Sequence, residues 1–221
     1  MTWYVVDGMD GCGKSTCAEL LKEKLESEGR RVRLFSHPDS GCLFGRLEYG
    51  YLLKEGRLAK MLATVFFILD AVDSLFKMRL SSRKYDDFIF VRYLMSVAYL
   101  PDGIYRKAYR IIKKLFPMPD EFILVDVDAE TSLRRIEARG EERESFENMD
   151  DLVRTREKML SLSDGWFVVD NTLPLEEVKR LIEDHASAVL SGMRGRVSPS
   201  VCARGTRRSR IPCGRPWRSP R

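Results

Sequence analysis

The first residues of the chain contain a strong motif for binding phosphate groups. Residues 8–15 read GMDGCGKS, which is the complete G-x-x-x-x-G-K-[ST] pattern of a phosphate loop. Glycines let such a loop turn its backbone N–H groups inward around an anion, and the lysine reaches the β- and γ-phosphates. The hydroxyl of Ser15 is the expected ligand of Mg²⁺. The motif predicts binding of ATP or a similar triphosphate by Gly8, Met9, Asp10, Gly11, Cys12, Gly13, Lys14, Ser15 and Thr16.

The phosphate loop lies between a predicted strand and a predicted helix. A β-favouring run covers residues 3–6, and residues 15–28 carry apolar side chains at helical spacing before Gly29. Further strands are predicted at 32–35, 88–91, 122–127 and 166–169, and helices at 43–55, 58–80, 93–116, 129–139, 147–162 and 174–190. Asp128 is predicted to cap the helix at 129–139, and Pro174 to open the last one. This alternation predicts an α/β fold of three layers, a P-loop NTPase fold with a five-stranded parallel sheet flanked by helices.

Composition excludes a disordered or fibrous chain. Of 221 residues, 44% are apolar and 32% are charged, which is typical of a folded globular protein. No run reaches the ~18 apolar residues of a membrane span, and the N-terminus lacks the pattern of a signal peptide. The five cysteines include no CxxC pair, so we expect free thiols. We therefore expect a cytoplasmic protein with no membrane contact.

Charge divides the chain into two parts. Residues 193–221 contain nine arginines and no lysine or acidic residue, so they carry +9 and leave −4 on residues 1–192. The segment is also rich in proline and poor in large apolar residues, which predicts a disordered tail after a single domain at 1–192. Clustered arginine can bind nucleic acid, but this composition fits a segment without function equally well.

Four stretches of the sequence resemble one family. DGMDGCGKST is similar to the phosphate loop of thymidylate kinases, and VRYLMSVAYL at 91–100 resembles their D-R-Y-x-x-S-x-x-A-Y-Q segment. FILVDVDAETSLRRIEARG resembles their fourth strand and the following helix, and RGEERESFE falls where their arginine-bearing lid lies, near 139–147. The chain is thus identified as a divergent member of this family over about residues 1–180. The resemblance implies ATP-dependent phosphorylation of a nucleoside monophosphate, dTMP to dTDP, with Mg²⁺ as cofactor and nucleotides as partners; a homodimer is compatible with it.

The resemblance also implies roles for single residues. Arg92 would clamp the acceptor phosphate, Asp10 would contact the acceptor sugar and Tyr99 would lie beside the sugar C2 position. Without the resemblance, Arg92 reads as a surface charge, Asp10 as a turn residue and Tyr99 as a core residue. Arg139 and Arg143 would place positive charge over the transferring phosphoryl group, or belong to a solvated loop. The implied catalytic residues are Lys14, Arg92, Arg139 and Arg143.

Periodicity singles out Phe67. Within residues 58–76, six large apolar side chains form one helical stripe, and Phe67 lies opposite its centre. If the stripe faces the core, Phe67 faces away from it. The resemblance implies that Phe67 stacks on the acceptor base; a second packing face of the same helix is the alternative.

Several positions depart from the family pattern. Val91 stands where an aspartate is expected to organise the waters of Mg²⁺, so Asp7 or Asp10 would have to supply that carboxylate. Ser36-His37-Pro38 replaces Arg-Glu-Pro, and Ser145 replaces an arginine of the lid. In the expected acceptor site, arginine is replaced at Tyr49 and Ala71, and glutamine at Leu100.

These departures leave two other functions open. One is an ATP-binding regulatory protein of kinase ancestry that phosphorylates no nucleotide, which Val91 makes credible. The other is a nucleic-acid-associated ATPase recruited through the basic tail.

Overall fold

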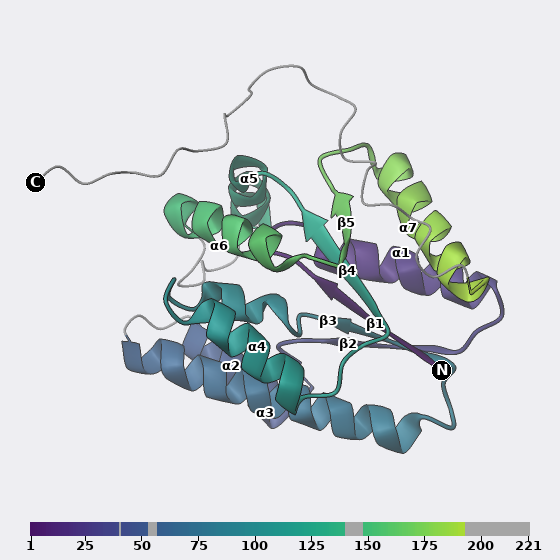
Figure 1. The fold of residues 1–221 in the computed structure, drawn as a ribbon, viewed down its shortest axis with the longest axis horizontal. Coiled ribbons are helices and arrows are strands. Elements are labelled where there is room, and N and C mark those ends of the chain that lie inside the picture. Colours follow the sequence, from purple (N-terminus) through teal and green to yellow (C-terminus); the bar gives the residue numbers. More distant parts are fainter. Residues whose placement is uncertain (40, 53–56, 140–147, 193–221) are drawn as a thin grey trace, which may run out of the picture.

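The described part of the computed structural model is built around one parallel sheet (Figure 1). It covers residues 1–39, 41–52, 57–139 and 148–192. The strands of the sheet are β1 (Thr2–Asp7), β2 (Val32–Ser36), β3 (Asp87–Val91), β4 (Glu121–Asp126) and β5 (Phe167–Asp170). They are all parallel, in the order β2-β3-β1-β4-β5. The prediction of a five-stranded parallel sheet is confirmed.

Helices cover both faces of the sheet. They are α1 (Lys14–Ser27), α2 (Leu43–Leu52), α3 (Arg57–Ser81), α4 (Tyr105–Leu115), α5 (Ala129–Arg139), α6 (Met149–Leu162) and α7 (Leu175–Leu190), with a 3₁₀ helix η1 (Met95–Tyr99). In Figure 1, α1 and α7 pack side by side on one face, whereas α3 and α4 lie on the other. This three-layer arrangement leaves the carboxyl ends of the strands open to ligands.

The sheet order places the site. β1 is the central strand, with β3 on one side and β4 on the other. Folds of this kind bind ligands at the carboxyl ends of these neighbouring strands. The parallel register aligns Val6 with Val91, and Val91 with Ser36. The strand ends that carry the phosphate loop, Arg92 and His37 therefore meet at one edge. The strands behind them are buried, with Val5, Val6 and Ile89 fully enclosed.

The structure corrects the helix expected at 93–116. After Arg92 the chain forms the short 3₁₀ helix η1, and α4 begins only at Tyr105. Pro101 lies between the two and interrupts helical hydrogen bonding, as proline does in a helix interior. The predicted helix at 43–55 is observed to Leu52, with residues 53–56 outside the described part. Asp128 does cap α5, accepting the N–H of Thr131 at 2.7 Å.

The structure also corrects the orientation expected for α3. Members of the apolar stripe are exposed, with Val65 and Val72 at 45% and Phe76 at 61%. The buried face instead carries small and polar residues: Ala63, Asp70, Ala71 and Ser74. The assumption that the stripe faces the core was wrong, because periodicity locates an apolar face but does not say what covers it.

The remaining expectations concern thiols, membranes and the tail. Cys12, Cys17 and Cys42 are free, as expected. Within the described residues, no helix combines the length and the apolar character that crossing a membrane requires. The basic segment 193–221 and most of the expected lid at 139–147 lie outside the described residues.

Candidate active site

The phosphate loop connects β1 to α1 in a conformation that glycine makes possible. Gly11 and Gly13 have φ of +72° and +92°, in the left-handed region that side chains disfavour. A Cβ on Gly11 would also lie 2.5 Å from the carbonyl oxygen of Ser132. Gly13 is the N-cap of α1, so the positive end of that helix faces the loop. The loop therefore has the geometry of an anion site.

Residues of α5 and of the chain after β5 hold this loop from outside. The Ser132 hydroxyl donates to the Asp10 carbonyl oxygen. The carbonyl oxygen of Cys12 accepts the side-chain amide of Asn171 at 2.7 Å and the guanidinium of Arg135 at 3.4 Å. Arg135 also donates to the Asn171 carbonyl at 2.9 Å. Because these partners bind loop carbonyls, they favour the outward orientation of C=O groups that an anion site needs. Sequence reasoning missed Ser132, Arg135 and Asn171, since no motif marks them.

Lys14 lies at the start of α1 and turns back over the loop. Its Nζ donates to the Met9 carbonyl at 2.7 Å and lies 3.4 Å from Asp10 Oδ1. The Lys14 side chain is buried, with only 7% of the residue exposed. Residues of the loop accept the hydrogen bonds of the Lys14 ammonium, so the ammonium lies beside the place where phosphates would bind.

Asp10 joins three of the predicted site residues. Its Oδ1 accepts a hydrogen bond from the guanidinium of Arg92 and lies near Lys14, while Oδ2 accepts the Tyr99 hydroxyl at 2.6 Å. The Asp10 side chain is 4% exposed and that of Arg92 17%. The family resemblance placed Asp10, Arg92 and Tyr99 in one site, and the structure brings them into direct contact.

The backbone at Arg92 is strained. Arg92 has φ of +65°, and it is the one non-glycine residue with positive φ in the described part of the chain. Such a conformation costs about 1 kcal/mol for an L-residue. Its N–H donates to the Val6 carbonyl at 3.2 Å, which anchors it to the end of β1. Strain of this kind, held by surrounding contacts, is common in functional sites.

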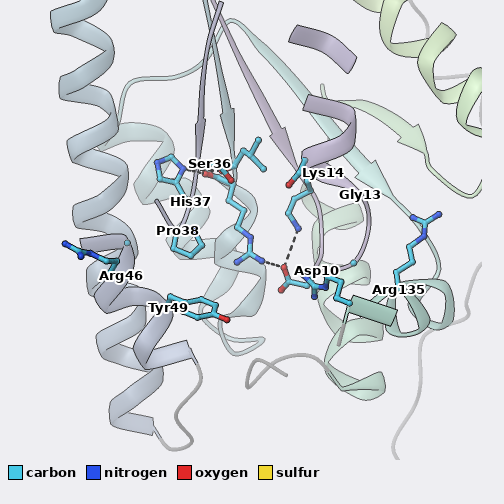
Figure 2. A pocket seen from close by; sticks show the side chains of 15 residues that line it. Asp10, Gly13, Lys14, Ser36, His37, Pro38, Arg46, Tyr49 and Arg135 are labelled. Carbon is cyan, nitrogen blue, oxygen red and sulfur yellow. Dashed lines mark hydrogen bonds and ion pairs between the residues drawn. The ribbon is translucent and has the colours of Figure 1, made fainter. Parts of the chain in front are cut away.

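A cavity of about 670 Å³ opens over the phosphate loop (Figure 2). Five of its lining residues are cationic: Lys14, Arg46, Arg92, Arg135 and Arg139. Asp10 is the one carboxylate among its described lining residues, and it is shared by Lys14 and Arg92. In Figure 2, Arg46 extends away from Asp10. The excess of positive charge suits a polyanion such as a triphosphate.

A second cavity of about 890 Å³ shares Asp10 and Arg92 with the first. Phe67 of α3 and Tyr99 of η1, which the family resemblance assigned to the acceptor, both line it. The expected contact of Phe67 with a ligand therefore has room, although the reasoning about the apolar stripe was wrong. Leu100 also lines this cavity, and Tyr49 lines the first one. Arg139 ends α5 at the phosphate cavity, whereas Arg143 lies outside the described residues.

The Asp7 carboxylate, one of the two candidates to replace the missing aspartate, is engaged by backbone groups. Its side chain is buried and accepts the backbone N–H groups of Tyr93, Leu94 and Met95 at 2.9–3.2 Å. Burial raises the pKa of this carboxyl above its ordinary value, although the three N–H groups oppose the shift. Asp7 thus caps the chain entering η1, and the expectation that Asp7 or Asp10 organises the waters of Mg²⁺ stays a prediction.

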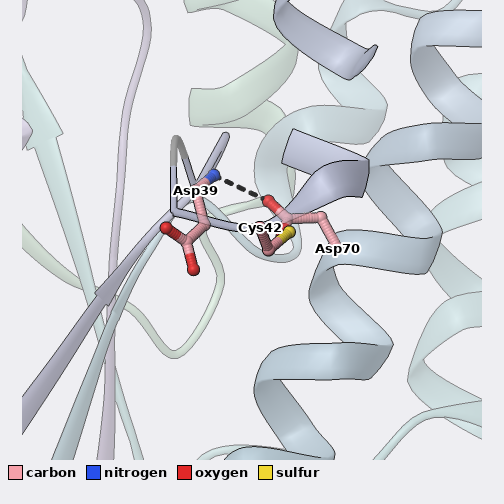
Figure 3. Close-up of side chains that lie close together, drawn as sticks. All are labelled: Asp39, Cys42 and Asp70. Carbon is pink, nitrogen blue, oxygen red and sulfur yellow. Dashed lines mark hydrogen bonds between the residues drawn. The ribbon is translucent and has the colours of Figure 1, made fainter. Parts of the chain in front are cut away.

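Three side chains near the start of α2 form a second cluster (Figure 3). The ligand atoms of Asp39, Cys42 and Asp70 lie within 4.8 Å of one another. The Asp70 carboxylate accepts a hydrogen bond from each of the other two residues. Cys42 Sγ donates to Oδ1 at 2.9 Å, and the backbone N–H of Asp39 donates to Oδ2 at 2.8 Å. Burial raises the pKa of the Cys42 thiol most, and its hydrogen bond to Asp70 raises that pKa further. Asp70 thus fastens the loop between β2 and α2 to α3.

A phosphate loop at the carboxyl edge of a parallel sheet, buttressed from outside and lined with cations, defines a P-loop nucleotide-binding protein. Residues 6–182 match the family model described as thymidylate kinase. Three relatives are each 33% identical. They are a probable thymidylate kinase of Pyrobaculum aerophilum (184 residues, 80% of this chain and 92% of the relative), a probable thymidylate kinase of Archaeoglobus fulgidus (181 residues, 79% and 89%) and a thymidylate kinase of Xanthomonas oryzae (181 residues, 79% and 78%). The chain belongs to the thymidylate kinase family.

Proposed function

We propose that the protein transfers the γ-phosphoryl group of ATP to dTMP, forming ADP and dTDP. The observation that carries this proposal is that Asp10 and Arg92 line both cavities. Phosphoryl transfer requires donor and acceptor in adjoining sites, with the reacting groups in line. Family membership supports dTMP as the acceptor.

Positioning and charge neutralisation would drive the transfer. Lys14 would exchange the Met9 carbonyl for the β- and γ-phosphates, while the loop N–H groups bind the remaining oxygens. Arg92 would hold the acceptor phosphate between the two cavities. Arg139, at the end of α5, would add positive charge where it builds up on the transferring group. Arg143 keeps the same proposed role from the segment outside the described residues.

The acceptor would lie in the second cavity. The ring of Phe67 would stack on the base, and Tyr99 and Asp10 would lie beside the sugar. Each of these residues lines the cavity, and the Tyr99–Asp10 hydrogen bond fixes two of them relative to each other.

The donor set near the loop fits Mg²⁺ with one protein ligand. Ser15 lines the phosphate cavity at the start of α1, where its hydroxyl would bind the ion beside the nucleotide. Magnesium keeps several waters and accepts phosphate oxygens as ligands, so a single hydroxyl suffices to place it. When bound, the ion neutralises charge on the phosphates. Val91 leaves the position of the expected carboxylate apolar, and Asp10 is engaged with Lys14 and Arg92.

A coupled assay of ADP formation tests the proposed function. The full chain is supplied with ATP, Mg²⁺ and each nucleoside monophosphate in turn, and dTMP is expected to give the highest rate. ATP binding without transfer to any monophosphate would refute the proposal and favour the regulatory alternative.

We also infer that a second copy of the chain covers the apolar stripe of α3. The exposed apolar residues of this face are Val65, Ile68, Leu69, Val72, Phe76 and Leu80 of α3. Contiguous apolar surface of this kind marks interaction sites, and a two-fold axis lets one helix face cover itself.

Light scattering of the full chain tests this dimer. The parent is expected to be a dimer at micromolar concentration and Phe76→Glu a monomer. Leu115→Glu is the matched control, because Leu115 is 74% exposed but lies on α4. A monomeric parent would contradict the inference.

A further inference from the structure

His37 is a buried histidine to which none of the roles above gives a task. It follows β2 directly, is 3% exposed, and lies at the edge of the phosphate cavity (Figure 2). Its ring faces the end of β3 on one side and α3 on the other. Both ring nitrogens have hydrogen-bond partners.

The hydrogen-bond partners determine the tautomer of the neutral ring. Nδ1 lies 2.9 Å from the Arg92 carbonyl oxygen and 3.2 Å from that of Val91. Carbonyl oxygens only accept hydrogen bonds, so Nδ1 carries a hydrogen. Nε2 lies 2.9 Å from Ser74 Oγ and, in the neutral ring, accepts the hydrogen of that hydroxyl. The imidazole thus donates toward Arg92 and accepts from Ser74.

On the β3 side, the ring supports the strained backbone of Arg92. The N–H of Arg92 is held by Val6, and its carbonyl oxygen is held by His37. With both peptide groups fixed, the left-handed φ of +65° is maintained and the side chain is directed at Asp10. His37 therefore acts on the direction of the guanidinium without touching it.

On the α3 side, the ring contacts the helix that carries Phe67. Ser74 is seven residues after Phe67, two turns along the helix, so both lie on the same face. The Phe67 and His37 rings also make an edge-to-face contact, with centroids 6.2 Å apart and an interplanar angle of 78°. Ser74 is fully buried, so its hydroxyl is not exposed to bulk water.

We propose that His37 is a positioning residue that sets Arg92 relative to Phe67. It thereby fixes the distance between the group that binds the acceptor phosphate and the ring that stacks on the acceptor base. This rests on the proposed function, because it assigns both ends of one acceptor site to a single side chain. The ATP site depends on the phosphate loop and α5, and within the described residues the His37 ring hydrogen-bonds to neither of them.

Two substitutions separate the two sides of the ring. His37→Asn keeps a nitrogen at the δ position, which can still donate to the Arg92 carbonyl, and loses the contact with Ser74. His37→Gln keeps a polar atom at the ε position and loses the δ donor. Ser74→Ala removes the hydroxyl alone. Ser81→Ala is the matched control, because Ser81 is also buried on α3 but its hydroxyl bonds to the Lys77 carbonyl of its own helix.

Steady-state kinetics of dTMP phosphorylation provide the first measurement. One net hydrogen bond corresponds to roughly a tenfold change in an equilibrium constant. We therefore expect KM for dTMP to rise about tenfold in His37→Gln and about threefold in Ser74→Ala, with His37→Asn closer to the parent than His37→Gln. KM for ATP should stay within about twofold in every variant, and Ser81→Ala should match the parent. Equal rises in both KM values, or equal effects of Asn and Gln, would overturn the proposal.

A measurement independent of turnover separates this inference from the proposed function. Imidazole ¹⁵N shifts of the parent should show His37 protonated at Nδ1. The guanidinium signal of Arg92, identified by its loss in Arg92→Lys, should be retained in His37→Asn and shifted in His37→Gln. A parent that transfers nothing to dTMP but shows these signals would refute the function and leave the positioning role standing. Protonation at Nε2, or an Arg92 signal unchanged in His37→Gln, would overturn the positioning role itself.

Discussion

The hydrogen bond from Tyr99 to Asp10 ties η1 to the phosphate loop, and Tyr99→Phe removes the hydroxyl that donates it. The bond is 2.6 Å long and its acceptor is a carboxylate with 4% exposure. A hydrogen bond to a charged group contributes about 1.5–3 kcal/mol. Asp10 borders two cavities, so water can replace the hydroxyl in part, and we expect the lower end of that range. Tyr99→Phe should therefore lower the free energy of unfolding by about 1.5 kcal/mol.

Equilibrium unfolding in urea, combined with a double-mutant cycle, measures this contribution. In the Asp10→Asn background the acceptor is neutral, so removing the same hydroxyl should cost only about 0.5 kcal/mol. The coupling between the two positions is then about 1 kcal/mol. Tyr93→Phe is the control, because its hydroxyl donates to the Pro117 carbonyl at 3.0 Å and its effect should add to that of Asp10→Asn. If Tyr99→Phe lowers the free energy of unfolding equally in both backgrounds, the charge of Asp10 does not account for the contribution of the Tyr99 hydroxyl.

Three further predictions concern other residues. Lys14→Ala should lower the rate of phosphoryl transfer at least about 100-fold. It should lower the free energy of unfolding by only about 1 kcal/mol, because the Lys14 ammonium bonds to the loop and not to the core. A variant with parental turnover would contradict the phosphate-loop assignment. Val91→Asp should raise the single-turnover rate and lower the Mg²⁺ concentration for half-maximal rate, since it restores a carboxylate at the cavity; a slower variant would show that the apolar residue suits this site. Burial lowers the pKa of His185 from 6.5 to about 4, so the stability gained from the neutral ring is present above pH 6.5 and is lost as the pH falls toward 4. Between pH 6.5 and 4, the free energy of unfolding of His185→Leu should fall by about 3 kcal/mol less than that of the parent, measured by urea titration at each pH. If the free energies of parent and variant fall in parallel with pH, this prediction is wrong.

The phosphate loop and the sheet could be predicted because both depend on local patterns. A glycine-rich loop between an apolar strand and a helix has few alternative structures, and buried parallel strands are short continuous apolar runs. The contact of Asp10 with Arg92 and Tyr99 was approached only through a family resemblance, since these residues are 82 and 89 positions apart from Asp10.

The errors have a common physical cause. The continuous helix at 93–116 and the buried stripe of α3 were both inferred from apolar spacing, which does not contain the tertiary partners of a segment. Pro101 is a local signal against the first, because proline disfavours helical backbone in the residue before it. For the second, Asp70 and Ser74 face inward because the loop after β2 and His37 bond to them. The partners of Lys14 and Asp7 include backbone groups, which no sequence motif marks.

The carboxylate of Asp7 has a consequence for motion. The residue ends β1 and precedes the phosphate loop, and it also holds three successive amides at 93–95. Amides bonded to a buried group of the central strand exchange with solvent only when that strand opens. The amides of Tyr93, Leu94 and Met95 should therefore exchange as slowly as those of β1, so donor loop and acceptor segment form one cooperative unfolding unit. Opening and closing during a catalytic cycle must then come from elements outside this unit.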